Sequence, residues 1–476
     1  MKNVLLIGPY NRELRSGQFL APPLGVYRLA SNLKGKAEVD VVDPSLDALE
    51  AYIRLSEKRY DIIGHSVLHT TLPNDIQMIF DAHQLQPQAL QIAGGQGASF
   101  NHQLFQKTPV NIVARGTGEA QLESIIKDKP IESIAGLYVN GQPTPNLNGT
   151  NFTEISMNID FSMIPYERYW GEMSGRYDLK AMKNEGMLRT VRLMTSNYCP
   201  MGCSFCSSTN FLNDAAGSRQ KIKQLTPPEI LYLMKNAVES HPETEAFYFN
   251  DDDFLISRQR ADEFCSMMEN MDYNLMCMGR VDDVDKNLLK KMKHAGFKII
   301  FYGVETFSGS LARDVKKSRN GYEKIARKSI EYTLDAGITP QMALILFLPT
   351  TTQKDLEVTI DNAVDLVGQG ARVTVLPYVE AYSGATIVKN GHKVRNLGFK
   401  AGGEEFAIPY FVSPDNPDIE NLAAASMQYK EKLNSSRGGK VSQPVDALNL
   451  FKAVYTKLGK STDRIDDVIS DISWQA

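Results

Sequence analysis

Two long stretches of the sequence alternate short apolar segments with amphipathic ones, and this rhythm constrains the fold more than any other feature. In the first stretch the expected strands are residues 3–8, 39–43, 61–66, 90–95 and 111–116. Buried strands separated by helical patterns are typical of a parallel sheet covered by helices on both faces. The sequence therefore predicts a Rossmann-like, doubly wound α/β domain over residues 1–135.

Small residues follow three of these expected strands. Ser66, Gly94 with Gly95, and Gly116 stand at the carboxyl ends, where ligands bind to sheets of this kind. Residues without bulk let a ligand approach the backbone closely, although glycines here also simply make tight strand-to-helix turns. The residues alone leave both interpretations open.

The alternation resumes after Met187. The expected strands are residues 188–196, 246–251, 274–280, 298–305, 340–349 and 372–380. Six strand–helix units predict a partial or complete (β/α) barrel over residues 187–385, with its active site at the carboxyl ends of the strands. Residues 136–186 are expected to form a hairpin and a polar linker, and residues 386–476 a mostly helical C-terminal region.

Composition excludes several classes of protein. A chain of 476 residues is too long for one simple core, and five cysteines do not make a disulfide scaffold. A net charge of -4 predicts no general attraction to nucleic acid or to anionic membranes. No apolar run reaches the length of a spanning helix, and the first one is too short for a signal peptide. We expect a cytoplasmic protein with reduced thiols, which binds neither nucleic acid nor a membrane.

Three of the five cysteines fall within eight residues, as Cys199, Cys203 and Cys206. A structural zinc site needs a fourth ligand, but the next cysteine, Cys265, is far along the chain. Three close thiolates suit a [4Fe-4S] cluster that leaves one iron without a protein ligand. The spacing therefore predicts a cluster whose open iron binds a substrate or a cofactor.

This Cys-x3-Cys-x2-Cys spacing resembles the signature of the radical S-adenosylmethionine (SAM) enzymes, in which an aromatic residue, here Phe205, precedes the last cysteine. The resemblance implies that SAM chelates the fourth iron, with Phe205 among the SAM-binding residues. It also implies reductive cleavage of SAM to a 5′-deoxyadenosyl radical, which abstracts hydrogen from a small-molecule or peptide substrate. An external electron donor of the flavodoxin or ferredoxin type is implied as well.

The resemblance extends over most of the first 385 residues, to the radical SAM branch with an N-terminal cobalamin (B12)-binding-type domain. The strand ends "FNDDDF", "MGRVDD" and "FYGVET" are similar to those of that branch. This implies that Asp251 or Asp252 lies near SAM or substrate. It also implies Arg280 near the SAM carboxylate and Glu305 near its ribose. From the residues alone, the two aspartates could equally cap a helix.

Three more segments, "PPLGVYRLA", "IAGGQGAS" and "VARGTGEAQLESI", look like that branch's signatures around a corrin. If cobalamin binds, the resemblance implies contacts at Ser66, Gly94, Gly95, Gly116 and Glu119. Two departures leave cobalamin binding open. The loop after the first strand contains no histidine, and Gly97 stands where relatives often carry one.

Three functions are compatible with these features. The leading one is cobalamin-dependent methylation of an unactivated carbon or phosphorus centre. The second is a cobalamin-independent diol dehydratase acting on an aminoglycoside-like sugar, an epimerase or a cyclase, for which Asp251, Asp252, Tyr378 and Glu380 are candidate catalytic residues. The third is a non-catalytic corrin or redox-sensing module. Cys277 has the opposite strand parity to Arg280, so we expect it to face away from the barrel centre.

Overall fold

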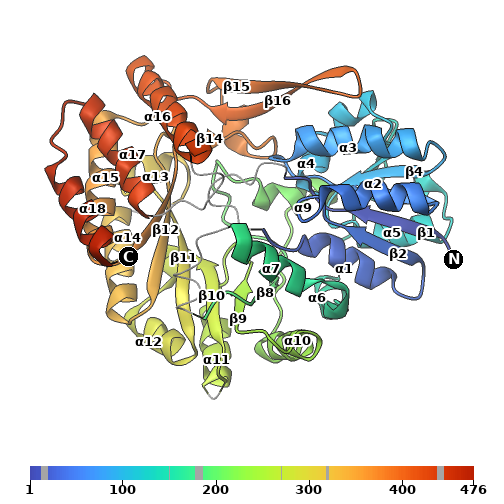
Figure 1. Ribbon diagram of the computed structural model, residues 1–476, viewed down its shortest axis with the longest axis horizontal. Helices are drawn as coiled ribbons and strands as arrows, with labels where there is room; N and C mark the ends of the chain where they lie inside the picture. Colours follow the sequence, from blue (N-terminus) through green and yellow to red (C-terminus); the bar gives the residue numbers. More distant parts are fainter. Residues whose placement is uncertain are drawn as a thin grey trace.

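The structure, a computed structural model, describes residues 1–11, 20–149, 151–176, 186–269, 271–317, 321–436 and 444–475. An N-terminal α/β domain stands beside a barrel, and helices with a β-hairpin complete the molecule (Figure 1). This α/β architecture of two parallel sheets is the predicted one.

The N-terminal sheet has seven strands within the described residues, in the order β2-β1-β3-β4-β5-β6-β7. The parallel strands are β1 (Asn3–Ile7), β2 (Glu38–Val42), β3 (Ile62–Ser66), β4 (Leu90–Gly94) and β5 (Ile112–Ala114). The helices around them are α1 (Leu24–Leu33), α2 (Ala48–Glu57), α3 (Leu72–Leu85), α4 (Gln96–Phe100) and α5 (Glu119–Ile126). Alternate residues of β1 enter two different cores, because Val4 and Leu6 pack on one face and Leu5 and Ile7 on the other.

The hairpin expected in the linker belongs to this sheet instead. Strands β6 (Leu137–Val139) and β7 (Gln142–Pro143) continue it in the antiparallel sense, beside β5. The unpaired edge of β5 would otherwise expose backbone groups, which the hairpin satisfies. The N-terminal sheet therefore ends at Pro143 and not at residue 135.

The barrel sheet has six parallel strands in the described part of the chain, in the order β13-β12-β11-β10-β9-β8. They are β8 (Thr190–Leu193), β9 (Ala246–Phe249), β10 (Asn274–Gly279), β11 (Phe297–Glu305), β12 (Thr339–Ile345) and β13 (Arg372–Leu376). The helices of this part are α9 (Ser208–Ala216), α10 (Pro227–Ser240), α11 (Arg258–Met268), α12 (Lys286–His294), α13 (Gly309–Asp314), α14 (Tyr322–Asp335) and α15 (Gln353–Gly368). Strands β8 and β13 are the two edges of the sheet, so the barrel is partial.

Every barrel strand alternates between two faces. Val191, Leu193, Phe247 and Phe249 are buried in the large core that also contains residues of the surrounding helices. Cys277 lies in the same core, which confirms that it faces away from the barrel centre. The residues that alternate with these core positions face the barrel interior, so the inner and outer faces of the sheet carry different side chains.

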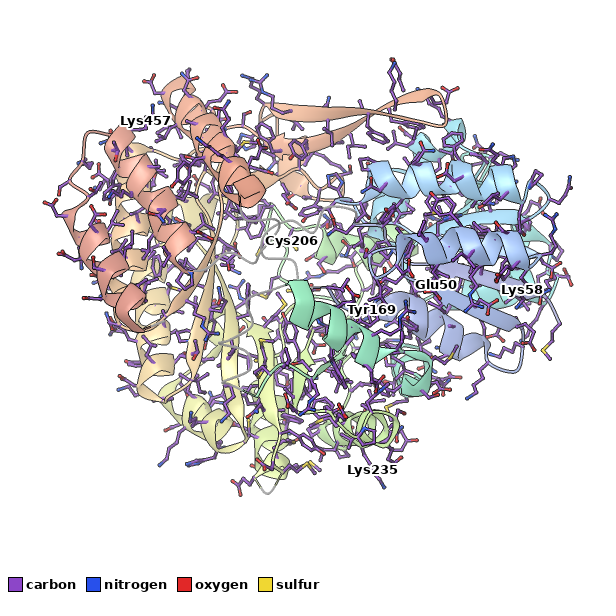
Figure 2. The ribbon with its side chains drawn as sticks, in the orientation of Figure 1. Glu50, Lys58, Tyr169, Cys206, Lys235 and Lys457 are labelled. Atoms are coloured by element: carbon purple, nitrogen blue, oxygen red, sulfur yellow. The ribbon has the colours of Figure 1, made fainter. Side chains whose placement is uncertain are left out.

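The linker contains α6 (Phe152–Met157) and α7 (Tyr166–Arg176), and α7 covers the edge of β8. The backbone N–H of Arg192 donates to the Tyr166 hydroxyl at 3.1 Å, and the Trp170 indole donates to the carbonyl of Thr190 at 3.1 Å. The Tyr169 hydroxyl donates to Asp43, at the end of β2, at 2.6 Å. Helix α7 therefore bridges the two domains, and Figure 2 shows Tyr169 at this junction.

The C-terminal region contains more than the expected helices. Besides α16 (Pro417–Ser436), α17 (Pro444–Lys457) and α18 (Asp463–Gln475), it forms an antiparallel sheet of β14 (Val379–Glu380), β16 (Glu404–Val412) and β15 (Val394–Ala401). We call residues 394–412 the β15–β16 arm. In Figure 1 it runs along the top of the molecule from the barrel to α3.

The β15–β16 arm docks on the N-terminal domain. The backbone N–H of Gly402 donates to Gln77 at 3.2 Å, and Lys107 donates to the carbonyl of Glu405 at 3.3 Å. Phe406 and Ile408 share a core with the buried face of α3. The two domains are thus joined by α7 on one side and by the arm on another. Among the described helices, none is long and apolar enough to cross a membrane.

Candidate active site

A cavity of about 890 Å³ joins the ligand-binding edge of the N-terminal sheet to the interior of the barrel. Four of the five predicted corrin contacts line it, namely Ser66, Gly94, Gly95 and Gly116. Glu119 does not, because its carboxylate accepts a hydrogen bond from Arg28 at 2.8 Å on the neighbouring helix. Arg28 is the member of this ion pair that reaches the cavity.

The glycines of the β4 loop are required by the backbone around them. Gly95 has φ +89, and a Cβ there would lie 2.7 Å from the carbonyl oxygen of Val67. At Gly97 a Cβ would lie 2.5 Å from the carbonyl carbon of Leu68. Gly97 is where relatives often carry a histidine, so the close approach of residues 67 and 68 explains why no imidazole stands here. Gly94 differs, since a Cβ there would meet Ala114 only at 3.8 Å.

Among the described histidines, His65 is the one that lines the cavity. Its Nε2 atom lies 2.7 Å from Oε1 of Gln91. Burial lowers the pKa of His65 to about 4, so the imidazole is neutral at neutral pH. A ring nitrogen already engaged in a buried hydrogen bond is poorly placed to act as a metal ligand.

The cysteine loop follows β8 and is held in place by its neighbours. The N–H of Ser204 donates to the carbonyl of Val315 at 2.9 Å, and its carbonyl accepts from Ile387 at 2.8 Å. The Thr209 hydroxyl donates to the carbonyl of Cys199 at 2.8 Å. Cys206 lies near the middle of the molecule, between the N-terminal domain and the barrel (Figure 2). The loop is therefore preformed, with all three thiols half-buried.

The three thiols fit a cluster better than a single ion. Within the described ranges, no three His, Cys, Asp or Glu side chains lie close enough together to hold one metal ion. A cubane binds three thiolates through three different irons, so its ligands stand further apart than those of a single ion. Burial raises the pKa of Cys199 and of Cys206 to about 12, so in the metal-free protein these thiols hold their protons. Metal binding would displace those protons.

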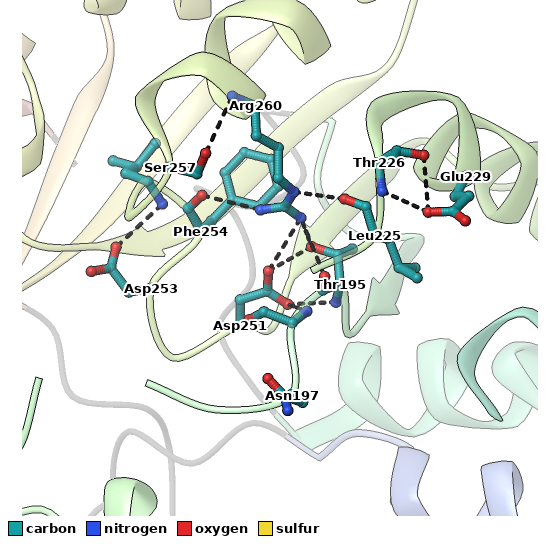
Figure 3. A network of polar contacts seen from close by, with 12 residues as sticks. Thr195, Asn197, Leu225, Thr226, Glu229, Asp251, Asp253, Phe254, Ser257 and Arg260 are labelled. Atoms are coloured by element: carbon teal, nitrogen blue, oxygen red, sulfur yellow. Dashed lines mark hydrogen bonds and ion pairs between the residues drawn. The ribbon is translucent and has the colours of Figure 1, made fainter. Parts of the chain in front are cut away.

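Asp251 is a positioning residue and not a free carboxylate. Its Oδ1 accepts hydrogen bonds from the backbone amides of Thr195 and Ser196, the latter at 3.0 Å. Its Oδ2 accepts from the Thr195 hydroxyl at 2.5 Å and lies 3.6 Å from the guanidinium of Arg260 (Figure 3). Both oxygens are occupied in fixing the segment that leads into the cysteine loop. Asp251 also lines the cavity, so its assignment as a catalytic candidate stays a prediction beside this structural role.

Asp252 is the carboxylate that the cavity can use. It is exposed to the cavity, and its Oδ2 accepts a hydrogen bond from the Ser208 hydroxyl. Although the carboxylate reaches the cavity, the protein around it displaces bulk water, and this desolvation raises the pKa of Asp252. Asp252 thus remains a candidate for proton transfer, next to the loop that carries the cysteines.

Tyr378 and Glu380 do not line this cavity, and their role as candidate catalytic residues stays a prediction. The chain leaves the barrel after Leu376 and enters the antiparallel sheet of the C-terminal region. There the Tyr378 ring packs against Phe411, with centroids 5.2 Å apart, and Glu380 accepts a hydrogen bond from the Tyr382 hydroxyl. Both side chains serve the packing of that sheet.

Arg280 and Glu305 border the cysteine loop, at the ends of β10 and β11. The Arg280 guanidinium lies 3.9 Å from the sulfur of Cys203 and donates to Asp282 at 2.9 Å and to the carbonyl of Lys317 at 2.6 Å. Burial opposes the positive charge of Arg280, but the ion pair with Asp282 raises its pKa. Phe205 packs with the small apolar cluster beside this loop and does not line the cavity.

Glu305 has a strained backbone. Its φ is +64, a region that L-residues other than Asn and Asp rarely adopt and that is often found at functional sites. The carboxylate lies 3.6 Å from the Lys317 ammonium, with 12% of the side chain exposed. Burial raises the pKa of Glu305, and Lys317 opposes that rise.

Several buried polar atoms around Arg280 have no hydrogen-bond partner. They are Nε of Arg280, Oδ2 of Asp253, Oδ1 of Asp282 and Oδ2 of Asp283. Burial and the neighbouring Asp283 carboxyl raise the pKa of Asp253 to about 8, so this pair of carboxyls holds a proton at neutral pH. These groups interact among themselves, since Nε of Arg280 lies 3.9 Å from Oδ2 of Asp283 and the Asp253 and Asp283 carboxyls are neighbours. They offer a set of polar atoms beside Cys203 to a ligand.

The interior of the barrel contains residues that the sequence reading missed. They are Arg192, Tyr248, Met276, Met278, Ile299, Phe301, Gln341, Arg372 and Thr374, all of which line the cavity. The sequence contained a signal for these residues, because the side chains of each strand alternate between two faces and these residues lie between the buried core positions. The polar members Arg192, Gln341 and Arg372 interrupt otherwise apolar strands, and that interruption marks an inner face.

Comparison with known proteins shows what this chain is similar to. Residues 193–363 match the model of the radical SAM superfamily. A methyltransferase of Pyrococcus horikoshii, itself uncharacterised, is 23% identical over 398 residues, which are 79% of this chain and 81% of the relative. The anaerobic magnesium-protoporphyrin IX monomethyl ester cyclase of Cereibacter sphaeroides is 24% identical over 374 residues, which are 72% of this chain and 56% of the relative.

Two solved structures share the whole architecture. The radical SAM methyltransferase TsrM from Kitasatospora setae, bound to tryptophan and a SAM analogue, has a TM-score of 0.64 at 15% identity, over 85% of this chain and 79% of TsrM. The cobalamin-dependent radical SAM enzyme OxsB, with aqua-cobalamin and SAM bound, has a TM-score of 0.64 at 16% identity, over 95% of this chain and 70% of OxsB. At these identities the likeness concerns the fold. It confirms the predicted combination of a B12-binding-type domain with a radical SAM barrel.

Proposed function

We propose that this chain, a radical SAM protein with a B12-binding-type domain, methylates an unactivated centre of a small molecule with the help of cobalamin. The observation that carries the proposal is the continuous cavity, which places the small-residue edge of the N-terminal sheet opposite the open interior of the barrel. A flat macrocycle against Ser66, Gly94 and Gly116 would face a substrate held inside the barrel. The relatives and structural neighbours named as methyltransferases support the same assignment.

Cys199, Cys203 and Cys206 would hold a [4Fe-4S] cluster, which together with SAM supplies a 5′-deoxyadenosyl radical when bound. The chain's own residues prepare the place for SAM. The unpaired carboxyl oxygens of Asp253 and Asp282 could accept hydrogen bonds from its ammonium group, and Nε of Arg280 could donate to its carboxylate. Glu305, on its strained turn, is proposed to accept from the ribose hydroxyls. Satisfying these buried groups on binding would favour SAM over water.

Cobalamin in this cavity would have no histidine ligand from the described residues. The backbone of residues 67 and 68 excludes a side chain at position 97, and His65 is buried with its Nε2 bonded to Gln91. We therefore propose a corrin whose lower face is free or bound to water. Arg28 and Asp43, which also line the cavity, are polar groups that could orient the amide side chains of the ring.

The surrounding chemistry defines the partners. A radical SAM reaction needs a reductant, and we propose a small flavodoxin or ferredoxin of the cytoplasm, where thiols stay reduced. Asp252 could take up or release a proton at the substrate, since its carboxylate faces the cavity.

One observation favours a second candidate. Asp252 supplies a carboxyl with a raised pKa inside the cavity, which methyl transfer does not strictly need but ring formation or dehydration does. The similarity to an anaerobic cyclase points the same way, although the match covers only 56% of that relative. A cobalamin-independent cyclase or dehydratase is therefore the alternative.

The ultraviolet–visible spectrum of protein reconstituted anaerobically with iron, sulfide and cobalamin tests the proposal. We expect a corrin band that survives desalting, together with the broad absorption of the cluster. Aerobically desalted protein, stripped of the cluster, serves as the reference for the corrin contribution. A protein that binds no corrin with its cluster intact, yet converts SAM to 5′-deoxyadenosine, would exclude the methyltransferase and favour the alternative.

A further inference from the structure

Arg192 projects into the barrel interior from β8. The strand register pairs Arg192 with Tyr248, Tyr248 with Met276, and Met276 with Ile299, so these four residues form one layer of the interior. All four line the cavity. The next layer, of Met278, Phe301, Gln341 and Arg372, continues the lining toward the other edge of the sheet. The interior is therefore largely apolar, with a guanidinium at each edge of the sheet, Arg192 on β8 and Arg372 on β13.

The charge of Arg192 is not neutralised by any described side chain. The recorded contact of its guanidinium is the Tyr248 ring, whose centroid lies 5.2 Å away. Burial lowers the pKa of Arg192, and the groups that oppose this shift are the tyrosines Tyr248 and Tyr166, not carboxylates. Arginine nevertheless keeps its proton, because its reference pKa is so high. Arg192 is half-buried and lines the cavity, so a partner from outside the chain can reach its charge.

None of the three carboxylates that line the described cavity wall pairs with Arg192. Asp43 accepts from the Tyr169 hydroxyl and from the backbone amide of Ser45. Asp251 is paired with Arg260, and Asp252 accepts from the Ser208 hydroxyl. The described part of the cavity wall thus contains an arginine prepared for an anion that the wall itself does not provide.

We propose that Arg192 anchors an anionic group of the substrate, a carboxylate or a phosphate, whose apolar body lies against Met276, Met278 and Phe301. The proposal rests on the proposed function, since it describes the substrate of that same cavity. A guanidinium binds a carboxylate or phosphate through two parallel hydrogen bonds, and stacking on Tyr248 fixes the plane of the fork. Arg192 lies on β8, the strand that leads into the cysteine loop. A substrate whose anion is bound by Arg192 would therefore extend toward that loop.

Binding of simple probes tests this without turnover. The probes are 4-phenylbutyrate, phenethyl phosphate and the neutral 4-phenylbutyramide, titrated by calorimetry into the cluster-loaded protein. We expect at least one of the two anions to bind about tenfold more tightly than the amide, as one hydrogen bond to a charged group predicts. The comparison between the two anions identifies whether the site prefers carboxylate or phosphate.

The variant Arg192→Met should lose that preference and bind the amide as the wild type does, which also shows that it is folded. Arg192→Lys keeps the charge without the fork and should retain part of the preference. Arg189→Gln is the matched control, because Arg189 lies just before the same strand but is paired with Glu245 outside the cavity. It should keep the full preference.

Two kinds of result would overturn the proposal. One is that neither anion binds the wild-type protein more tightly than the amide, or that Arg192→Met keeps the preference. The other is that Arg192→Met loses SAM affinity in parallel, since the anion would then be the carboxylate of SAM. Neither result depends on corrin binding or methyl transfer, so failure of the proposed function stays distinguishable from failure of this inference.

Discussion

Asp251 accepts a hydrogen bond from the backbone amide of Ser196 at 3.0 Å, across 55 residues of sequence. The end of β9 therefore holds the start of the cysteine loop, and Arg260 holds the carboxylate that does so. The geometry of the loop is thus built into the barrel.

Asp251→Ala should destabilise the barrel and impair retention of iron. Removing one member of a buried ion pair leaves the Arg260 charge without its carboxylate, with the carbonyls of Leu225 and Phe254 still bonded to it, and such a loss costs about 3–5 kcal/mol. The free energy of unfolding from urea titration measures this loss. Asp252→Ala is the matched control, because the neighbouring carboxylate faces the cavity, and it should change stability little. Equal effects of the two substitutions would contradict the structural role of Asp251.

Replacement of Cys199, Cys203 or Cys206 by alanine should each abolish SAM cleavage and remove most of the iron. A cubane held by three thiolates cannot spare one, and the reconstituted wild type should hold about four irons per chain. Cys265→Ala and Cys277→Ala are the controls, since both thiols are buried in the core. Iron and sulfide analysis decides the matter, and zinc without sulfide would contradict the cluster.

Glu305→Gln and Arg280→Gln should weaken SAM binding while the cluster persists. Each substitution removes a charge next to the unpaired polar atoms, and one charged hydrogen bond corresponds to about tenfold in affinity. Equilibrium dialysis with labelled SAM provides the measurement. Arg313→Gln, a change to an exposed arginine in nearby α13, should leave the affinity unaltered. If neither Glu305→Gln nor Arg280→Gln alters it, the SAM site lies elsewhere.

Gly94→Leu should block corrin binding without harming the cluster. The position tolerates a side chain, since a Cβ would meet Ala114 only at 3.8 Å, and it faces the cavity. Gly95 is a poorer choice, because a side chain there would collide with the Val67 backbone. Corrin absorbance and iron content are measured on the same sample. Gly171→Leu, on the exposed side of α7, is the control. If Gly94→Leu retains corrin, the ring does not bind at this edge of the sheet.

Gly402→Val should detach the β15–β16 arm from α3, whereas Gly403→Val should not. Both glycines have positive φ, +56 and +88, so the backbone strain of the two substitutions is similar. Only at Gly402 would a Cβ collide with a neighbour, the Phe80 ring at 2.2 Å. Hydrogen exchange of the arm and of α3 is the readout. Equal protection in the two variants would show that this contact does not hold the arm.

Much of the fold followed from periodicity, because buried parallel strands leave a simple apolar signal. The cysteine loop was equally visible, since its spacing is local. The sequence could not show which of Asp251 and Asp252 fixes the cysteine loop. The two are identical neighbours, and they differ only because Arg260, on a separate helix, contacts Asp251. The surroundings of Tyr378 and Glu380 were not readable for a related reason, as nothing in their own segment shows that the chain leaves the barrel after Leu376.

The β15–β16 arm illustrates the largest gap between sequence and structure. Its alternation around the pair Gly402–Gly403 is a readable hairpin pattern, but its partner, α3, lies more than three hundred residues earlier, with Gln77 and Gly402 separated by 325 positions. Local sequence contains no trace of such a distant contact.

The separation of α3 and the β15–β16 arm in the sequence also determines the order in which they leave the ribosome. The N-terminal domain emerges first, while the segment that covers α3 is made last among the elements it touches. At translation rates of about 5–20 residues per second, the apolar side of α3 stays bare for tens of seconds. During this interval the apolar side of α3 that the arm later covers is accessible to chaperones. An N-terminal domain expressed by itself would keep this bare surface permanently.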